Sequence, residues 1–171
     1  AALTSLSSAV LLPRVEVMNV FRFWSVGGVG RAENADTLTV LPFLVLGTVL
    51  CIATAGALNL LGLGDDAAAG LGVPVVRVRV MATAAGIVLS GAATALAGPI
   101  GFVGLVIPHL VRTVVGTDHR WLLPVSAFTG AALLTLADTV GRVVARPEEI
   151  EVGIITALIG APVFIWVVLT R

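Results

Sequence analysis

Long apolar segments separated by short polar connections dominate the pattern of this sequence. Thr37–Gly64 contains no charged residue, and a helix that crosses the hydrocarbon core of a bilayer needs about 20 mostly apolar residues. The next uncharged segment, Val80–Val111, is too long for one such helix, and Ala97–Gly101 (AGPIG) interrupts it with residues that end and restart helices. The predicted complete spans are Thr37–Gly64, Val78–Ala97, Phe102–Val115, Trp121–Val144 and Val152–Thr170.

The first part of the chain follows a different pattern. Ala1–Leu12 is apolar and lacks the basic start of a signal peptide, so we expect it to be the end of a sixth helix, cut short at its beginning. Arg14–Asp36 mixes polar and apolar residues. It predicts a connection with a short helix at the membrane surface, anchored by Phe21, Phe23 and Trp24.

Composition supports a membrane protein and excludes several classes. The chain is 58% hydrophobic and 12% charged with a mean hydropathy of +1.09, whereas soluble domains carry about twice that charged fraction. The formal net charge is zero, which argues against a nucleic-acid-binding protein. The single cysteine, Cys51, excludes a disulfide framework. With alternating spans, the arginines divide equally between the two sides, so the positive-inside rule leaves the orientation open.

One polar connection, Leu61–Pro74, predicts a short helix outside the membrane. Asp65 and Asp66 suit the first turn of a helix, Ala67–Ala69 favour its continuation, and Gly70 with Gly72 would end it. The segment is either a simple connector or an element with a mechanical role. A phosphate-binding glycine loop is disfavoured, because two carboxylates would repel phosphate and the chain has no lysine.

Two further segments carry polar residues at helix ends. Ala97–Arg112 is a broken helix followed by Pro-His, and its His109 has a structural role or serves as a ligand or proton carrier. Gly116–Pro124 predicts a tight turn with Asp118 and Arg120, which composition alone interprets as a solvated loop.

The last polar segment lies near the end of the fourth complete span. Asp138 and Arg142 are four residues apart on one helix face and can pair. An ionisable residue inside a span is a functional hypothesis by default, although local pairing near the helix end also explains Asp138. Glu148, Glu149 and Glu151 precede the final span, where acidic groups favour a helix N-terminus.

In this order the segments resemble the FecCD family, the permease subunits of ATP-binding-cassette (ABC) importers for ferric siderophores, haem and vitamin B12. The matching strings are FRFWSVGGVGRA, LNLLGLGDDAAAGLGV, AGPIGFVGLVIPHLVR, GTDHRWLLP, LLTLADTVGR and VGIITALIGAPVFIW. The resemblance implies an all-α, polytopic transmembrane helix bundle of the type II ABC importer permease fold. Residues 1–171 would form a single, N-terminally truncated domain that covers about the fifth to tenth of ten spans.

The same resemblance implies site residues. The family's ATPase-coupling loop aligns with residues 62–74, although it usually carries Glu and a following Arg that are absent here. Arg142 aligns with an outward basic position that docks the substrate-binding protein, and Gly27, Gly28 and Gly30 match a short helix beside the pore and would permit gating. The coupling-loop residues are Gly64, Asp65, Asp66, Ala67, Ala68, Gly70, Leu71 and Gly72.

The predicted function is therefore a permease subunit that moves a ferric siderophore or similar metal chelate inward. We expect no catalytic residue, metal or cofactor on this chain, with ATP and Mg²⁺ on a partner ABC ATPase. The other expected partners are a periplasmic or lipid-anchored binding protein, a second permease copy or paralogue, and the bilayer of a bacterial plasma (inner) membrane, with a cytoplasmic C-terminus. The alternatives are a haem or cobalamin permease, or a proton-coupled secondary transporter using Asp138.

Overall fold

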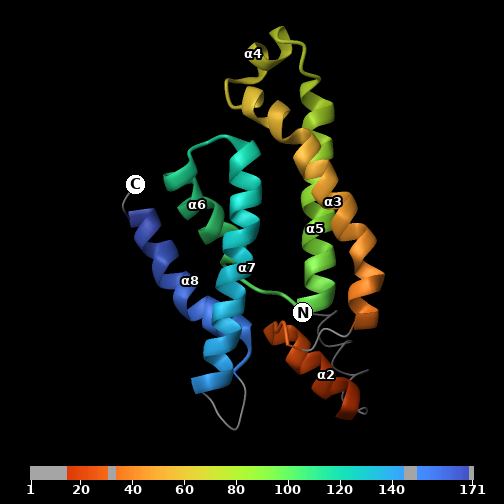
Figure 1. The fold of residues 1–171 in the computed structure, drawn as a ribbon, viewed down its shortest axis with the longest axis vertical. Coiled ribbons are helices and arrows are strands. Elements are labelled where there is room, and N and C mark those ends of the chain that lie inside the picture. Colours follow the sequence, from red (N-terminus) through yellow and green to blue (C-terminus); the bar gives the residue numbers. More distant parts are fainter. Residues whose placement is uncertain (1–14, 31–33, 145–149, 170–171) are drawn as a thin grey trace, which may run out of the picture.

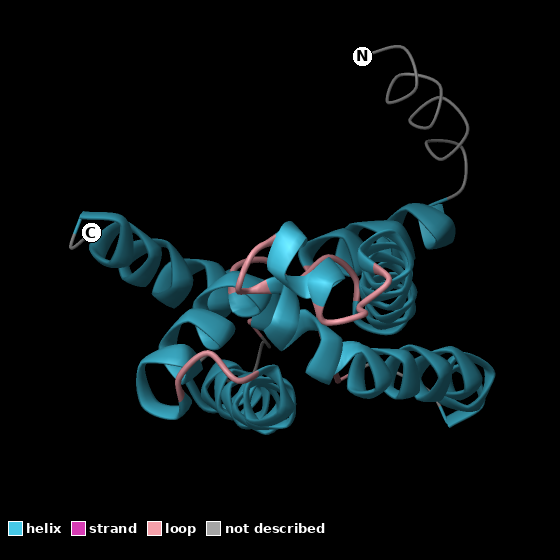
Figure 2. Ribbon diagram, turned by 90° about the horizontal axis from the view of Figure 1, so that it is seen from above, coloured by secondary structure: helices cyan, strands magenta, loops and turns pink. Residues whose placement is uncertain are grey.

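The described part of the chain is built from helices and their connections (Figure 2). A computed structural model describes residues 15–30, 34–144 and 150–169. The helices are α2 (Val15–Val26), α3 (Asn34–Leu61), α4 (Asp65–Gly70), α5 (Val75–Ala97), α6 (Val103–Val115), α7 (His119–Val144) and α8 (Val152–Leu169). The all-α prediction is confirmed, whereas the expected helix at Ala1–Leu12 lies outside the described residues.

The long helices α3 and α5 form an antiparallel pair that α4 joins at one end (Figure 1). Small residues bring the two helices together. A Cβ at Gly47 would lie 2.6 Å from Cγ of Leu89, and Ala55, Ala85 and Ala92 are buried. In a membrane, where lipid competes for apolar surface, such close backbone approach is the main source of helix association.

The second group of helices, α6, α7 and α8, packs around a small apolar core. Ile107, Val111 and Leu122 are buried together at the contact between α6 and the start of α7. The partly buried side chains that extend this core are Val103, Val115, Val125 and Leu133. The core thus fixes the connection between α6 and α7 in place.

Three of the predicted spans are long enough to cross a bilayer. Among the described residues, α3, α5 and α7 meet the length and hydropathy of a spanning helix, whereas α6 and the apolar stretch Val152–Ile165 of α8 are shorter. With 13 residues, α6 is about 20 Å long, against a hydrocarbon core of about 30 Å. The helix predicted at Phe102–Val115 is observed as α6, and the break at Gly98–Gly101 leaves it shorter than the three long spans.

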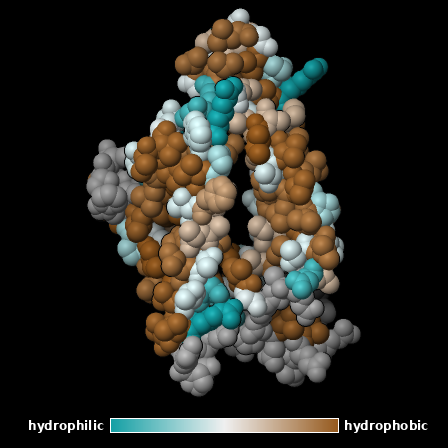
Figure 3. All heavy atoms as spheres, viewed as in Figure 1, coloured by the Kyte–Doolittle hydropathy of each residue, from teal (hydrophilic) through white to brown (hydrophobic). Residues whose placement is uncertain are grey.

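The polar connections gather at the two ends of the bundle (Figures 1 and 3). We call the end that holds α4 and the α6–α7 turn the α4 end, and the opposite end, which holds α2, the α5–α6 connection and the start of α8, the α2 end. Between them the surface is largely apolar (Figure 3), with exposed side chains such as Val114, Phe128 and Leu158. Lipid is the solvent that such a surface requires.

Candidate functional site

The helix α4 ends in a Schellman motif centred on Gly72. The Val73 N–H donates to the Ala68 carbonyl at 3.0 Å, and the Gly72 N–H donates to the Ala69 carbonyl at 2.9 Å. Gly72 has a φ of +81°, the left-handed conformation that this motif needs and glycine adopts without strain. The predicted helix is confirmed, with one refinement: Gly70 is its last helical residue and Gly72 makes the reversal.

An ion pair attaches the start of α4 to α5. Asp65 and Asp66 lie in the first turn of α4, as predicted, and Oδ1 of Asp65 lies 2.7 Å from Nη2 of Arg79. No sequence pattern indicates this contact, since the two residues are 14 positions apart. Together with the Schellman closure, the pair makes α4 a defined extension of the α3–α5 hairpin.

The outer surface of α4 is exposed. Asp66, Ala67 and Ala69 are exposed, whereas Ala68 is completely buried. On either side of the helix, Leu63 and Leu71 expose 67% and 62% of their surfaces. Apolar side chains flanking a short helix beyond the spans are available for contact with another protein.

A second contact at the α4 end joins α3 to the α6–α7 turn. The amide of Asn59 donates from Nδ2 to Oδ1 of Asp118, and its Oδ1 accepts from the His119 backbone N–H at 2.8 Å. Nδ1 of His119 also lies 2.8 Å from Asn59 Oδ1, so this ring nitrogen carries a proton in the contact. We call this group the Asn59 bridge.

Asp118 also begins α7. Its Oδ1 accepts the Arg120 N–H at 2.9 Å, the arrangement of an N-cap residue. This hydrogen bond, followed by the one from Asn59, holds the pKa of Asp118 below its usual value. The expected solvated loop is thus an ordered helix start. Asn59 was not predicted as a site residue, because no local pattern marks an asparagine near a helix end as a long-range partner.

At the α2 end, backbone groups of Gly27 and Gly28 connect three elements. The Gly28 N–H donates to the Ala97 carbonyl at the end of α5 (2.8 Å), and the Gly27 carbonyl accepts the Gly153 N–H of α8 (3.0 Å). Gly27 has a φ of +82°. The short helix predicted in this region is confirmed as α2. Exposed Phe21 and Trp24 lie on it with ring centroids 6.2 Å apart; the side chain of Phe23 lies outside the described part.

Glycines allow α2 to approach the ends of α5 and α8 this closely. A Cβ at Gly98 would collide with the Trp24 carbonyl oxygen, and one at Gly153 would collide with that of Val26. The obstacle in each case is backbone, which cannot move aside as a side chain can. The glycines here therefore serve close packing of α2 against the ends of α5 and α8.

The predicted docking arginine lies beside the predicted gate glycines. Nε of Arg142 is 2.8 Å from Oδ2 of Asp138, which confirms their pairing, and the two side chains are 44% and 30% exposed. The guanidinium occupies the space that a side chain at Gly30 would need, and the Glu151 carboxylate does the same at Gly28. Residues far apart in sequence thus form one cluster at the α2 end.

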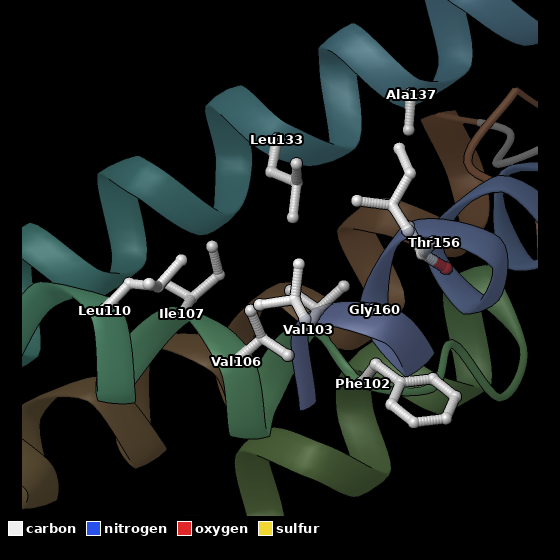
Figure 4. Close-up of a pocket in the computed structure, with 11 residues that line it drawn as sticks. Phe102, Val103, Val106, Ile107, Leu110, Leu133, Ala137, Thr156 and Gly160 are labelled. Carbon is white, nitrogen blue, oxygen red and sulfur yellow. The ribbon is translucent and has the colours of Figure 1, made fainter. Parts of the chain in front are cut away.

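The start of α6 is strained. Phe102 has a φ of +65°, the only positive φ of a non-glycine residue in the described ranges. Its ring lies against Gly160 of α8, where a Cβ would come within 2.8 Å of Phe102 Cγ. A cavity of about 100 Å³ lies beside it between α6, α7 and α8, with an apolar lining that includes Ile107 and Leu133 (Figure 4).

The described residues give little material for metal or acid–base chemistry. Within those ranges, no group of three His, Cys, Asp or Glu side chains could hold a metal ion. His109 lies half-buried in α6. The ionisable residues that do come together, in the Asp65–Arg79 pair, at the Asn59 bridge and around Arg142, hold helix ends in position.

Comparison with known proteins decides the family. The sequence model of the FecCD transport family matches residues 1–170. The chain belongs to the FecCD transport family. This confirms the resemblance inferred from the six sequence strings, and it agrees with the expectation of a transport protein over an enzyme.

Curated relatives of this chain are about twice as long as the part that it matches. It is 40% identical over 164 residues to the Fe(3+)-citrate import system permease protein YfmD of Bacillus subtilis, covering 96% of this chain and 49% of YfmD. It is 47% identical over 152 residues to the hemin transport system permease protein HmuU of Yersinia pestis, covering 88% and 45%. The chain spans about half the length of these relatives.

A solved structure supports the fold. One described as an inward-facing conformation of a metal-chelate type ABC transporter superposes with a TM-score of 0.78 at 32% sequence identity. The match covers 99% of this chain and 57% of the solved one. The arrangement of helices in Figure 1 is therefore shared with the matched part of that transporter.

Proposed function

We propose that the FecCD chain is part of a permease that imports a metal chelate, driven by ATP hydrolysis on a separate subunit. The observation that carries the proposal is α4: a short helix beyond the spans, closed by Gly72 and tied to α5 by Asp65 and Arg79. A short helix held at both ends moves as a body, which suits it to transmit a movement from a bound partner. We assign the partner contact to residues 62–74.

The orientation follows from this assignment. If α4 meets a cytoplasmic ATPase, the α4 end faces the cytoplasm and the α2 end faces outward, with a cytoplasmic C-terminus. Arg142, 44% exposed at the α2 end, then lies on the side from which a substrate-binding protein would dock. Exposed ion pairs across an interface fix register and association rate more than affinity.

For the pore we propose the neighbourhood of Gly27, Gly28 and Gly30. Gly27 and Gly28 connect α2 to the ends of α5 and α8, and Gly30 lies against Arg142 of α7. A shift of α2 would therefore alter the outer end of the bundle. A second permease copy or a paralogue would supply the other wall. The contacts of the three glycines favour movement of α2 as a unit over free bending at each glycine.

A ferric siderophore is the proposed cargo. Relatives are named for Fe(3+)-citrate, ferric enterobactin, hemin and cobalamin, so haem and cobalamin are the alternatives within the family. The proton-coupled alternative relied on Asp138. Its pairing with Arg142 gives that carboxylate a structural partner and supports the ATP-driven reading.

The test is reconstitution of the intact protein in proteoliposomes with its ATPase and binding protein. Ferric citrate, ferric enterobactin, haem and cobalamin are each offered in turn, with either ATP inside or an imposed proton gradient. We expect ATP-dependent uptake of one ferric chelate. Uptake that follows the proton gradient without the ATPase would overturn the proposal, as would an intact protein that does not bind the ATPase.

A further inference from the structure

The Asn59 bridge joins the end of α3, close to α4, to the start of α7. A movement of α4 could therefore pass through it from the α3–α5 hairpin to the other helices. Asn59 is two residues from the end of α3, and only a short turn separates that end from α4. The other half of the bridge, Asp118 and His119, forms the start of α7. The bridge therefore connects the segment that enters α4 with a helix that belongs to the other group of the bundle.

The two contacts of the bridge require a side chain at position 59 that both donates and accepts hydrogen bonds. The carboxylate of Asp118 can only accept hydrogen bonds, whereas the His119 backbone N–H can only donate. One asparagine side chain satisfies both, through Nδ2 and Oδ1. A residue with only donors or only acceptors at position 59 would break one of the two contacts.

The start of α7 is held so that it would move together with Asn59. Asp118 bonds at once to Asn59 and to the Arg120 N–H in the first turn of α7. Leu122, in the same turn, is buried in the core with Ile107 and Val111. A displacement of Asn59 would therefore move the start of α7 as a rigid unit. Because Leu122 packs against α6, α6 would move with it.

We propose that Asn59 and Asp118 are positioning residues that transmit the movement of α4 to α7. This inference rests on the proposed function, because it needs an ATPase that moves α4. The ion pair between Asp65 and Arg79 connects α4 to α5. The Asn59 bridge connects the end of α3, which leads into α4, with α7. One rigid-body movement of α4 then shifts three spanning helices together.

The experiment measures the number of chelate molecules imported per ATP hydrolysed, with the intact transporter in proteoliposomes and the chelate that the wild type imports. This ratio does not depend on how much protein is folded, so a merely stabilising role of the bridge would leave it unchanged. We expect Asn59→Ala and Asp118→Ala each to lower the ratio several-fold, because each removes the hydrogen bond through which the movement would reach α7. Thr117→Ala, an exposed neighbour in the same turn, is the matched control and should keep the wild-type ratio.

A reciprocal exchange tests whether the hydrogen bond itself is responsible. Asn59→Asp alone places two carboxylates together and should lower the ratio. The double variant Asn59→Asp with Asp118→Asn restores a donor facing an acceptor, keeps an acceptor for the His119 N–H, and should return most of the wild-type ratio. A double variant no better than the single ones would overturn the proposal.

The outcomes separate the two levels of inference. Alanine variants with the wild-type ratio overturn the role of the bridge and leave the ATP-driven permease intact, whereas a wild type without ATP-driven uptake overturns both. If the alanine variants do not assemble, Asn59→Gln carries the test, because it keeps the amide but displaces it by one methylene. A wild-type ratio in Asn59→Gln would then contradict the proposal.

Discussion

Asp65 and Arg79 join the first residue of α4 to the second turn of α5, with Oδ1 and Nη2 2.7 Å apart. Both side chains are more than half exposed, so water screens the pair and its contribution to stability is small. Its structural consequence is larger, since it fixes how α4 sits on the hairpin. Stability and coupling should therefore respond very differently to its removal.

Replacing Arg79 with alanine separates these two effects. We expect the free energy of unfolding to change by less than about 1 kcal/mol, while ATP-driven uptake falls because α4 is no longer held against α5. Thermal unfolding in detergent and uptake in proteoliposomes measure the two quantities. Arg77→Ala removes a nearby exposed charge and should leave uptake unchanged. A Gly72→Ala change is a poor substitute test, since its φ of +81° adds strain of its own.

Gly98→Ala should disrupt the contact between α2 and α5. The new Cβ would meet the Trp24 carbonyl oxygen, and the φ of +72° at Gly98 already disfavours a side chain. We expect a loss of at least about 2 kcal/mol in the free energy of unfolding. Gly101→Ala is the control, because that glycine lies in the same connection with open space around its Cβ position. Equal melting temperatures for the two variants would contradict the packing described for the α2 end.

The spans and α4 were the parts of the fold most accessible from sequence. The predicted span Val78–Ala97 agrees with α5 to within three residues at one end, because the uncharged run that begins at Val80 and the glycine at position 98 leave few choices. Asp65 and Asp66 were placed in the first turn of α4 for a local reason, the helix dipole. Where local chemistry decides, the sequence is sufficient.

The contacts between segments were not accessible in the same way. The pairing of Asp138 with Arg142 could be predicted from their spacing on one helix, but no spacing rule relates Asn59 to Asp118. The gating role of Gly27 and Gly28 stays a prediction, and no sequence pattern indicated the packing contacts that their backbones make. The residues next to a glycine in the sequence do not predict which distant backbone will pack against it.

The ionisation of Asp118 gives a pH dependence with a definite sign. Hydrogen bonds from the Arg120 N–H and the Asn59 amide lower its pKa in the folded protein. The stabilisation is therefore fully present above the unfolded-state pKa of about 3.9 and is lost as pH falls through the lower folded-state pKa. When thermal unfolding is measured from pH 6 to pH 3, the melting temperature should fall more steeply for the wild type than for Asp118→Asn. Parallel curves would show that Asp118 carries no such linkage.

Arg142 should affect docking more through rate than through affinity. We expect Arg142→Gln to slow association of the binding protein by roughly two- to tenfold at low salt, with a smaller effect at high salt where charges are screened. Surface-captured transporter in nanodiscs gives the association rate directly. Arg112→Gln removes the same charge at the α4 end and should leave docking unchanged. An effect of Arg112→Gln as large as that of Arg142→Gln would reverse the orientation proposed for the bundle.

The contact of α4 with an ATPase is the claim on which the account depends most. A cysteine placed at Ala67, on the exposed side of α4, in a Cys51→Ala background of the intact transporter allows this contact to be measured by cross-linking in membranes. The account predicts a cross-link to the ATPase subunit from position 67 and none from a cysteine at Val20, which is exposed on α2 at the opposite end. A cross-link from position 20 in place of position 67, or labelling of position 67 by an impermeant reagent from the outside of intact cells, would contradict it.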